Sequence, residues 1–183
     1  MPRARLGPDA VVDAAAALAD AEGLEAVTLA RLAAGLGVRA PSLYVHVDGL
    51  PDLRRRLAAR GARELGVALQ AAAAGRAGGD ALAAVAAAYR DYARAHPGTY
   101  AAAQRASDLG AEGAAVLDTV AAVMRGYGFD GDEAIHAVRI VRAALHGFAA
   151  LETDEGFGIP LDVDATFARL VGVLDHGLES RSG

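Results

Sequence analysis

Alanine accounts for 47 of the 183 residues, and this enrichment limits the possible folds more than any other feature of the sequence. Alanine is the best helix former, whereas aromatic residues amount to only 5% and β-branched residues never form alternating runs of strand length. Leucine, valine, isoleucine and phenylalanine add 44 residues, which is enough for a packed core. We therefore predict an all-α protein of one or two small domains.

The missing residue types exclude much chemistry. Without cysteine there can be no disulfide, thiolate zinc site or cysteine nucleophile, and without lysine there can be no P-loop or lysine Schiff base. None of the four serines lies in a GxSxG elbow, and no two of the five histidines have the spacing that places two metal ligands on one helical face. We expect a protein that is not an enzyme and has no cofactor and no metal.

The sequence carries no signal for a membrane. The first ten residues, MPRARLGPDA, lack the apolar region of a signal peptide, and no run of 18 residues is free of both charge and glycine. We expect a soluble, cytoplasmic chain without a membrane partner.

Capping and breaking residues predict about nine helices. Pro8 and Gly23 bound the first helix, Thr28 is a good N-cap for the second, and Pro41 fits the first turn of a short third helix. The remaining helices are expected over residues 50–74, 80–96, 99–106, 111–127, 131–152 and 163–179.

Charge divides the chain in two. Residues 1–66 hold nine arginines against eight acids, whereas residues 67–183 hold nine against fifteen. A pI near 5.5 is therefore only weak evidence against nucleic-acid binding, since binding depends on the local patch. We predict an N-terminal domain over residues 1–66 and a C-terminal helical bundle over residues 67–183.

Three short helices followed by a long one, with a turn at residues 36–38, predict a helix-turn-helix. Ala33 is small where two helices cross, and Gly37 supplies the positive φ of a tight turn. A small core forms beneath from Leu29, Leu32, Val38 and Leu43. The third helix then offers DNA the exposed residues Arg39, Ala40, Ser42, Tyr44 and His46. A short amphipathic helix pair without any role in DNA binding would have the same pattern.

Residues 28–47, TLARLAAGLGVRAPSLYVHV, resemble the signature of the tetracycline-repressor (TetR) family of bacterial transcriptional regulators. Leu145-His146-Gly147-Phe148 is similar to the tryptophan-histidine-glycine type of C-terminal domain in some of these regulators. The resemblance implies a homodimer with DNA-binding residues in the segment from Thr28 to His46, of which Tyr44 and His46 match positions that mostly meet phosphates.

Three residues depart from the family pattern. Arg39 stands where serine or threonine is usual, Val47 replaces a phenylalanine, and Leu50 replaces a lysine that often contacts phosphate. Arginines at positions 54–56 offer a substitute charge, so Arg54 joins the expected DNA contacts. Such a run is otherwise a solvated helix face.

Regulators of this family generally pair through their last two helices, and the sequence permits a four-helix dimer interface. The helix expected over residues 131–152 is apolar on two faces and so needs two partners. The expected interface comprises Ile140, Ala144, Gly147, Leu151, Phe167, Leu170 and Leu174. A monomer that packs these residues inward is the alternative.

A ligand site is expected in the C-terminal half. Tyr89, Tyr92 and His96 share one helical face, and Tyr100 and Gln104 follow beyond Pro97. Aromatic residues with polar tips can orient a small molecule, and Arg142 and His146 would suit an anionic group. The aromatic residues are otherwise core, and the basic stripe is otherwise solvent-exposed.

These observations predict a repressor that binds a palindromic double-stranded operator and is released by an unidentified small-molecule effector. The alternative is a helical ligand-binding or interaction module whose DNA binding is lost or altered.

Overall fold

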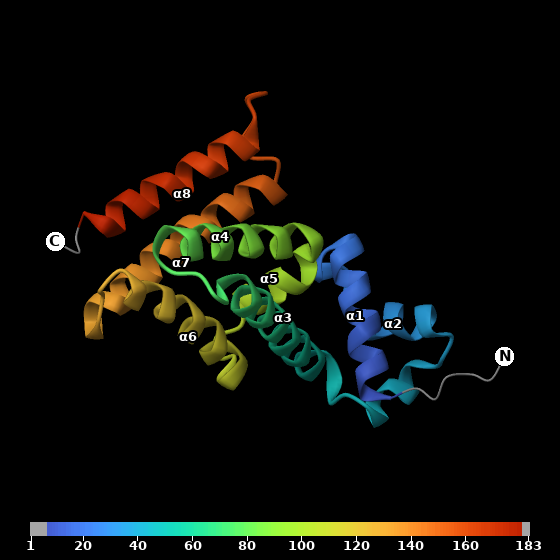
Figure 1. Cartoon of the computed structure of the whole chain (residues 1–183). Coiled ribbons are helices and arrows are strands. Elements are labelled where there is room, and N and C mark those ends of the chain that lie inside the picture. Colours follow the sequence, from blue (N-terminus) through green and yellow to red (C-terminus); the bar gives the residue numbers. More distant parts are fainter. Residues whose placement is uncertain (1–6, 181–183) are drawn as a thin grey trace. The chain divides into compact units, whose positions relative to one another are not determined.

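The computed structural model describes residues 7–180, and every regular element in that range is a helix (Figure 1). The prediction of an all-α fold is confirmed, and nine of the ten elements correspond to the nine expected helices. The tenth, η1, is a single 3-10 turn. The elements are α1 (Pro8–Glu22), η1 (Leu24–Ala26), α2 (Leu29–Leu36), η2 (Ala40–Val45), α3 (Gly49–Ala73), α4 (Gly78–Ala95), α5 (Pro97–Arg105), α6 (Gly110–Gly126), α7 (Gly131–Thr153) and α8 (Val163–Glu179).

The third expected helix, η2, is a 3-10 helix of six residues. The Ser42 N–H donates to the Arg39 carbonyl and the His46 N–H to the Leu43 carbonyl, both at 2.9 Å. Bonds that span three residues suit so short a segment, and Pro41 in its first turn has no N–H to donate. The segment that we expect to enter DNA is therefore wound more tightly than an α-helix.

Two compact units make up the described chain. The first combines the described residues of Met1–Arg63 with Ala95–Glu112, and the second combines Glu64–Arg94 with the described residues of Gly113–Gly183. The sequence-based division between residues 66 and 67 differs from this, because residues 95–112 pack with the first unit. Contacts with residues far away in the sequence place this segment in the first unit, and no local sequence pattern predicts such contacts.

The core of the first unit lies between α1, α2, η2, α5 and the beginning of α3. Val11, Ala15, Leu43, Leu53 and Leu57 are completely buried in it. Leu32 and Ala33 are also buried, and Leu29 and Val38 pack partly buried against them, so the small core predicted beneath the turn is confirmed.

Helix α5 lies directly against α1. A Cβ placed on Gly98 would come within 2.1 Å of the Ala19 backbone, so only glycine permits this approach. Nearby, the Asp20 carboxylate accepts the Thr99 N–H at 2.7 Å and pairs with His96 Nδ1 at 3.2 Å. A side chain of α1 therefore satisfies an N–H in the first turn of α5, a group that has no partner within its own helix.

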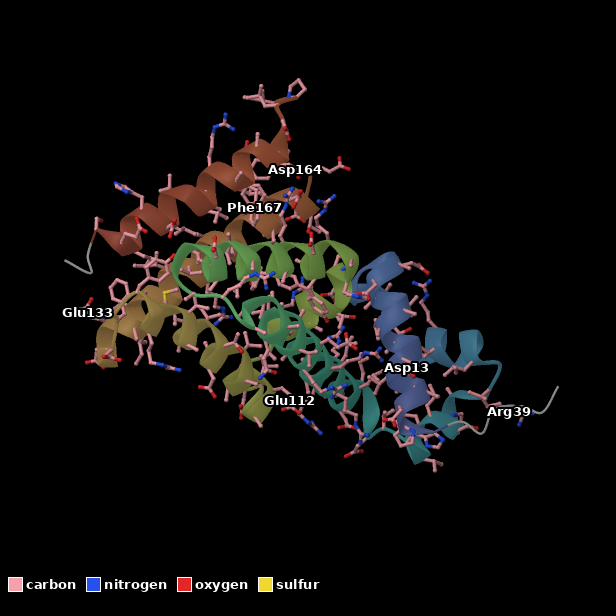
Figure 2. The ribbon with its side chains drawn as sticks, in the orientation of Figure 1. Asp13, Arg39, Glu112, Glu133, Asp164 and Phe167 are labelled. Atoms are coloured by element: carbon pink, nitrogen blue, oxygen red, sulfur yellow. The ribbon has the colours of Figure 1, made fainter. Side chains whose placement is uncertain are left out.

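In the second unit, one buried arginine joins three helices. Arg90 of α4 donates two hydrogen bonds to Glu152 of α7, at 2.8 and 2.5 Å, and one to Asp164 of α8 at 2.7 Å. Its guanidinium carbon lies 4.7 Å from the centre of the Phe167 ring, and Figure 2 shows Phe167 and Asp164 on α8. The hydrogen bonds from Arg90 lower the pKa of Glu152, so this pair stays charged at neutral pH.

Helices α7 and α8 run side by side in this unit (Figure 1). By length and composition alone α7 could cross a membrane, with a mean hydropathy of 1.3 over its most apolar 18 residues, of which 33% are buried. The core helix of a water-soluble bundle passes the same test. The apolar composition therefore fits a helix that packs on its own unit along one side and leaves apolar residues exposed along another.

Substitution of Gly98 tests the contact between α1 and α5. Gly98→Ala is expected to lower the free energy of unfolding by about 1–3 kcal/mol, because the added methyl group meets rigid backbone. Urea titration followed by circular dichroism measures the change.

The matched control is Gly35→Ala in α2, where no described residue outside the neighbouring backbone of the helix lies within 4 Å of the added Cβ. This variant is expected to gain about 0.5–1 kcal/mol through higher helix propensity. Equal stability of the two variants would contradict the close approach.

Candidate nucleic-acid interface

Helix α2 begins and ends as its sequence predicts. Thr28 Oγ1 accepts the Arg31 N–H at 3.2 Å, which caps the first turn. At the other end Gly37 adopts the left-handed conformation, with φ of 65°, and the Val38 N–H donates to the Ala33 carbonyl at 2.9 Å. The predicted positive φ of Gly37 is confirmed, and this turn directs the chain into η2.

Two buried side chains attach η2 to the first unit: Leu43 is 0% exposed and Val47, just beyond its end, is 2% exposed. The opposite side of η2 faces solvent. Arg39, Ser42, Tyr44 and Val45 are exposed there, and Ala40 and His46 are half-buried. Figure 2 shows Arg39 pointing outward from the turn before η2. The structure thus gathers the expected DNA-binding residues from Arg39 to His46 on one short element and adds Val45, which sequence reasoning missed.

Basic side chains near this element differ in their partners. Arg31 of α2 pairs with Glu22 at 2.6 Å, and Arg54 of α3 pairs more loosely with Glu25 at 3.4 Å. Among the described residues, the Arg39 guanidinium makes no ion pair. Arg39 is therefore the arginine of the helix-turn-helix that is available to an external partner without breaking such a pair.

Asp52, in the first turn of α3, holds the connection that follows η2. Its carboxylate accepts the Asp48 N–H at 3.0 Å and pairs with Arg55 and with Arg56, the latter at 2.9 Å. The hydrogen bond from Asp48 is the main cause that lowers the pKa of Asp52, and the neighbouring arginines add to it. Sequence reasoning missed this residue, although an acid in a first helical turn is a capping signal.

The seven residues expected to bind a ligand are divided between the two units. Tyr89, Tyr92, Arg142 and His146 belong to the second unit, and His96, Tyr100 and Gln104 to the first. The three tyrosines are buried, and the Tyr92 hydroxyl donates to Glu64 at 3.1 Å. His96 pairs with Asp20 within the first unit.

Most residues expected at a dimer interface leave apolar surface on the second unit. Ile140 and Leu151 of α7 are about half exposed, at 51% and 49%, and Ala144 and Gly147 between them are half-buried. On α8, Leu170 and Leu174 are half-buried, whereas Phe167 is buried against Phe148 and Arg90. Phe167 therefore packs into its own unit instead of offering its side chain to a partner.

A groove of about 280 Å³ between α7 and α8 adjoins this surface. Its lining is largely apolar and includes Ile140 and Leu174 from the expected interface. The other lining residues are Phe129, Glu133, His136, Ala137, Val173, Gly177 and Leu178.

The fold and the exposed face of η2 define a helix-turn-helix DNA-binding protein with a second helical unit. Two family models match the chain: "Bacterial regulatory proteins, tetR family" over residues 11–46, and "Tetracyclin repressor-like, C-terminal domain" over residues 82–174. The chain belongs to the TetR family of transcriptional regulators. Proteins of this family are regulators and not enzymes.

Similar proteins agree with this assignment. The chain is 40% identical to Rv0681 of Mycobacterium tuberculosis, an uncharacterized HTH-type transcriptional regulator, over 98% of this chain and 84% of that protein. It is 38% identical to YobS of Bacillus subtilis, also an uncharacterized HTH-type regulator, over 85% of this chain and 84% of that one. Among solved structures, a TetR variant of Acinetobacter baumannii in complex with minocycline has the same fold, with a TM-score of 0.79 and 20% identity over 98% of this chain and 99% of that one.

The lowered pKa of Asp52 predicts a specific pH dependence of stability. A carboxylate whose pKa is lower in the folded state contributes its full stabilisation above its ordinary pKa of 3.8 and loses it as pH falls through the lowered value. Asp52→Asn is therefore expected to cost about 1–3 kcal/mol near neutral pH and to converge with the unmodified protein in acid.

Urea unfolding at a series of pH values measures this difference, with Asp118→Asn on the exposed part of α6 as the control. A stability difference between Asp52→Asn and the unmodified protein that stays constant from neutral to acidic pH would contradict the role given to the charge.

Proposed function

We propose that this regulator is a homodimeric repressor that binds a two-fold operator through η2 and leaves it when a small-molecule effector binds. The observation that carries the proposal is the short η2 helix, attached by Leu43 and Val47, whose outer side consists of exposed donors and small apolar groups. Such a surface is suited to the major groove, where donors meet bases and phosphates.

Arg39 is the residue to which we assign base reading. It stands at the entrance of η2, is exposed and has no ion-pair partner among the described residues. A guanidinium can form two hydrogen bonds to a guanine edge. Tyr44 and His46 are assigned to phosphates, which position the protein without reading sequence.

The assignment predicts that substitutions of these residues change DNA binding in different ways. Arg39→Ala is expected to cost about 1–3 kcal/mol against the preferred site and to relax the choice of base there. Tyr44→Phe and His46→Ala are expected to weaken binding to all sequences alike, and each lost phosphate contact should flatten the log-log salt slope by about 0.9.

Titration of a selected operator and of a random duplex at several salt concentrations measures both effects. If Arg39→Ala weakens both duplexes equally and flattens the slope, Arg39 binds phosphate and the base assignment is wrong. A protein that binds neither duplex in a salt-dependent way would fit the alternative, a helical module that has lost DNA binding.

Dimerisation through α7 and α8 is proposed from the apolar surface that these helices leave exposed. Ile140, Ala144, Gly147 and Leu151 recur at helical spacing along α7, so they form one stripe. Among residues 7–180, no atom outside the neighbouring backbone of α7 lies within 4 Å of a Cβ placed on Gly147, which leaves space there for a second copy. Covering such a stripe in a partner removes apolar area from water.

Gly147→Arg is expected to convert the dimer to a monomer, because a charged side chain would be buried without a partner at the centre of the stripe. Sedimentation at micromolar protein measures the change. Ala122→Arg, on the exposed side of α6, is the control and should remain dimeric. An unmodified protein that sediments as a monomer would end the proposal.

The effector site is proposed in the second unit, around Tyr89 and Tyr92 of α4, with Arg142 and His146 of the same unit suited to an anionic group. Buried aromatic rings with polar tips support a small, partly apolar molecule. Because residues 145–148 are similar to the tryptophan-histidine-glycine type of C-terminal domain, we assign the second unit to that type. We also propose a cytoplasmic location. Release of bound operator by an added small molecule is the measurement that would identify the effector.

A further inference from the structure

Val45 is an exposed residue of η2 to which the proposed function gives no role. Its side chain is 81% exposed, more than Tyr44 beside it at 61% and more than the loop residue Leu161 at 73%. Single exposed apolar residues are common on protein surfaces and by themselves need no explanation. Val45 differs because it lies on the short element whose outer side forms the DNA-binding surface.

The geometry of η2 determines which way Val45 faces. A 3-10 helix has three residues per turn, so Ser42 and Val45 lie one above the other. Leu43 and Val47 occupy the buried side, which places the ridge of Ser42 and Val45 on the outer side with Tyr44. The valine methyl groups therefore face whatever contacts η2.

The major groove offers an apolar side chain one complementary group, the C5-methyl of thymine. The other groups on base edges in that groove are hydrogen-bond donors and acceptors, which a valine cannot satisfy. Contact with a thymine methyl would remove both groups from water, whereas contact with a polar edge would leave that edge unpaired.

We propose that Val45 is a specificity-determining residue that selects thymine at one position of each operator half-site. The proposal rests on the proposed function, since it requires η2 to enter the major groove. It adds a base preference that is read through methyl contact and not through hydrogen bonds.

Truncation on both sides of the contact tests the proposal, because deoxyuridine lacks the C5-methyl group of thymine and alanine lacks both γ-methyl groups of valine. The probe is the tightest-binding duplex selected from a randomised library, in which each thymine in turn is replaced by deoxyuridine. At one thymine of each half-site the unmodified protein is expected to bind about fourfold more weakly after the replacement, the effect of one buried methyl group. Val45→Ala is expected to bind the duplex with thymine at that position and the duplex with deoxyuridine there with equal affinity.

The matched control is Val67→Ala, which truncates another exposed valine, on the part of α3 that belongs to the second unit. It should keep the fourfold ratio, and both variants should fold normally because the truncated side chains are exposed. Specific DNA binding without any methyl-sensitive thymine, or an unchanged ratio in Val45→Ala, overturns the role of Val45 while the proposed function stands. Failure of the unmodified protein to select any duplex overturns the proposed function itself.

Discussion

Close contact between helices at small residues is the constraint on which this structure depends. With nine aromatic residues and no tryptophan, the chain has few large side chains to fill wide gaps between helices. The helices of the first unit instead approach until Gly98 meets the Ala19 backbone and Gly61 meets Thr99. Alanine therefore has two effects, because it favours helix formation and also permits a short distance between helix axes.

Charged side chains connect helices that are distant in the sequence. Asp20 of α1 reaches the first turn of α5, and Arg90 of α4 joins the end of α7 to the beginning of α8. Each of these groups satisfies donors or acceptors that would otherwise lack a partner. The contacts of Asp20 with His96 and Thr99 are among those that place residues 95–112 with the N-terminal helices.

The exposure of the DNA-binding surface also results from the small number of large side chains in this chain. Leu43 of η2 and Val47 just beyond it are buried and Ala40 packs partly buried against the same core, whereas Ser42, Tyr44 and Val45 remain exposed. Asp52 holds the Asp48 N–H directly afterwards and thereby fixes the beginning of α3. A rigid attachment on both sides lets a six-residue helix present its side chains in one arrangement.

The sequence alone determined the helical class, the order of the helices, the Thr28 cap, the Gly37 turn and the core residues beneath it, because each depends on local propensity or on spacing within a few residues. It also indicated the family, since the signature over residues 28–47 is contiguous. Only the tertiary structure decided that residues 95–112 pack with the first unit, that Phe167 is buried against Arg90, that Asp52 holds the Asp48 N–H and that Val45 faces solvent. These outcomes depend on which helix faces meet in space, and an alanine-rich sequence carries little information about that because alanine is tolerated on every face of a helix.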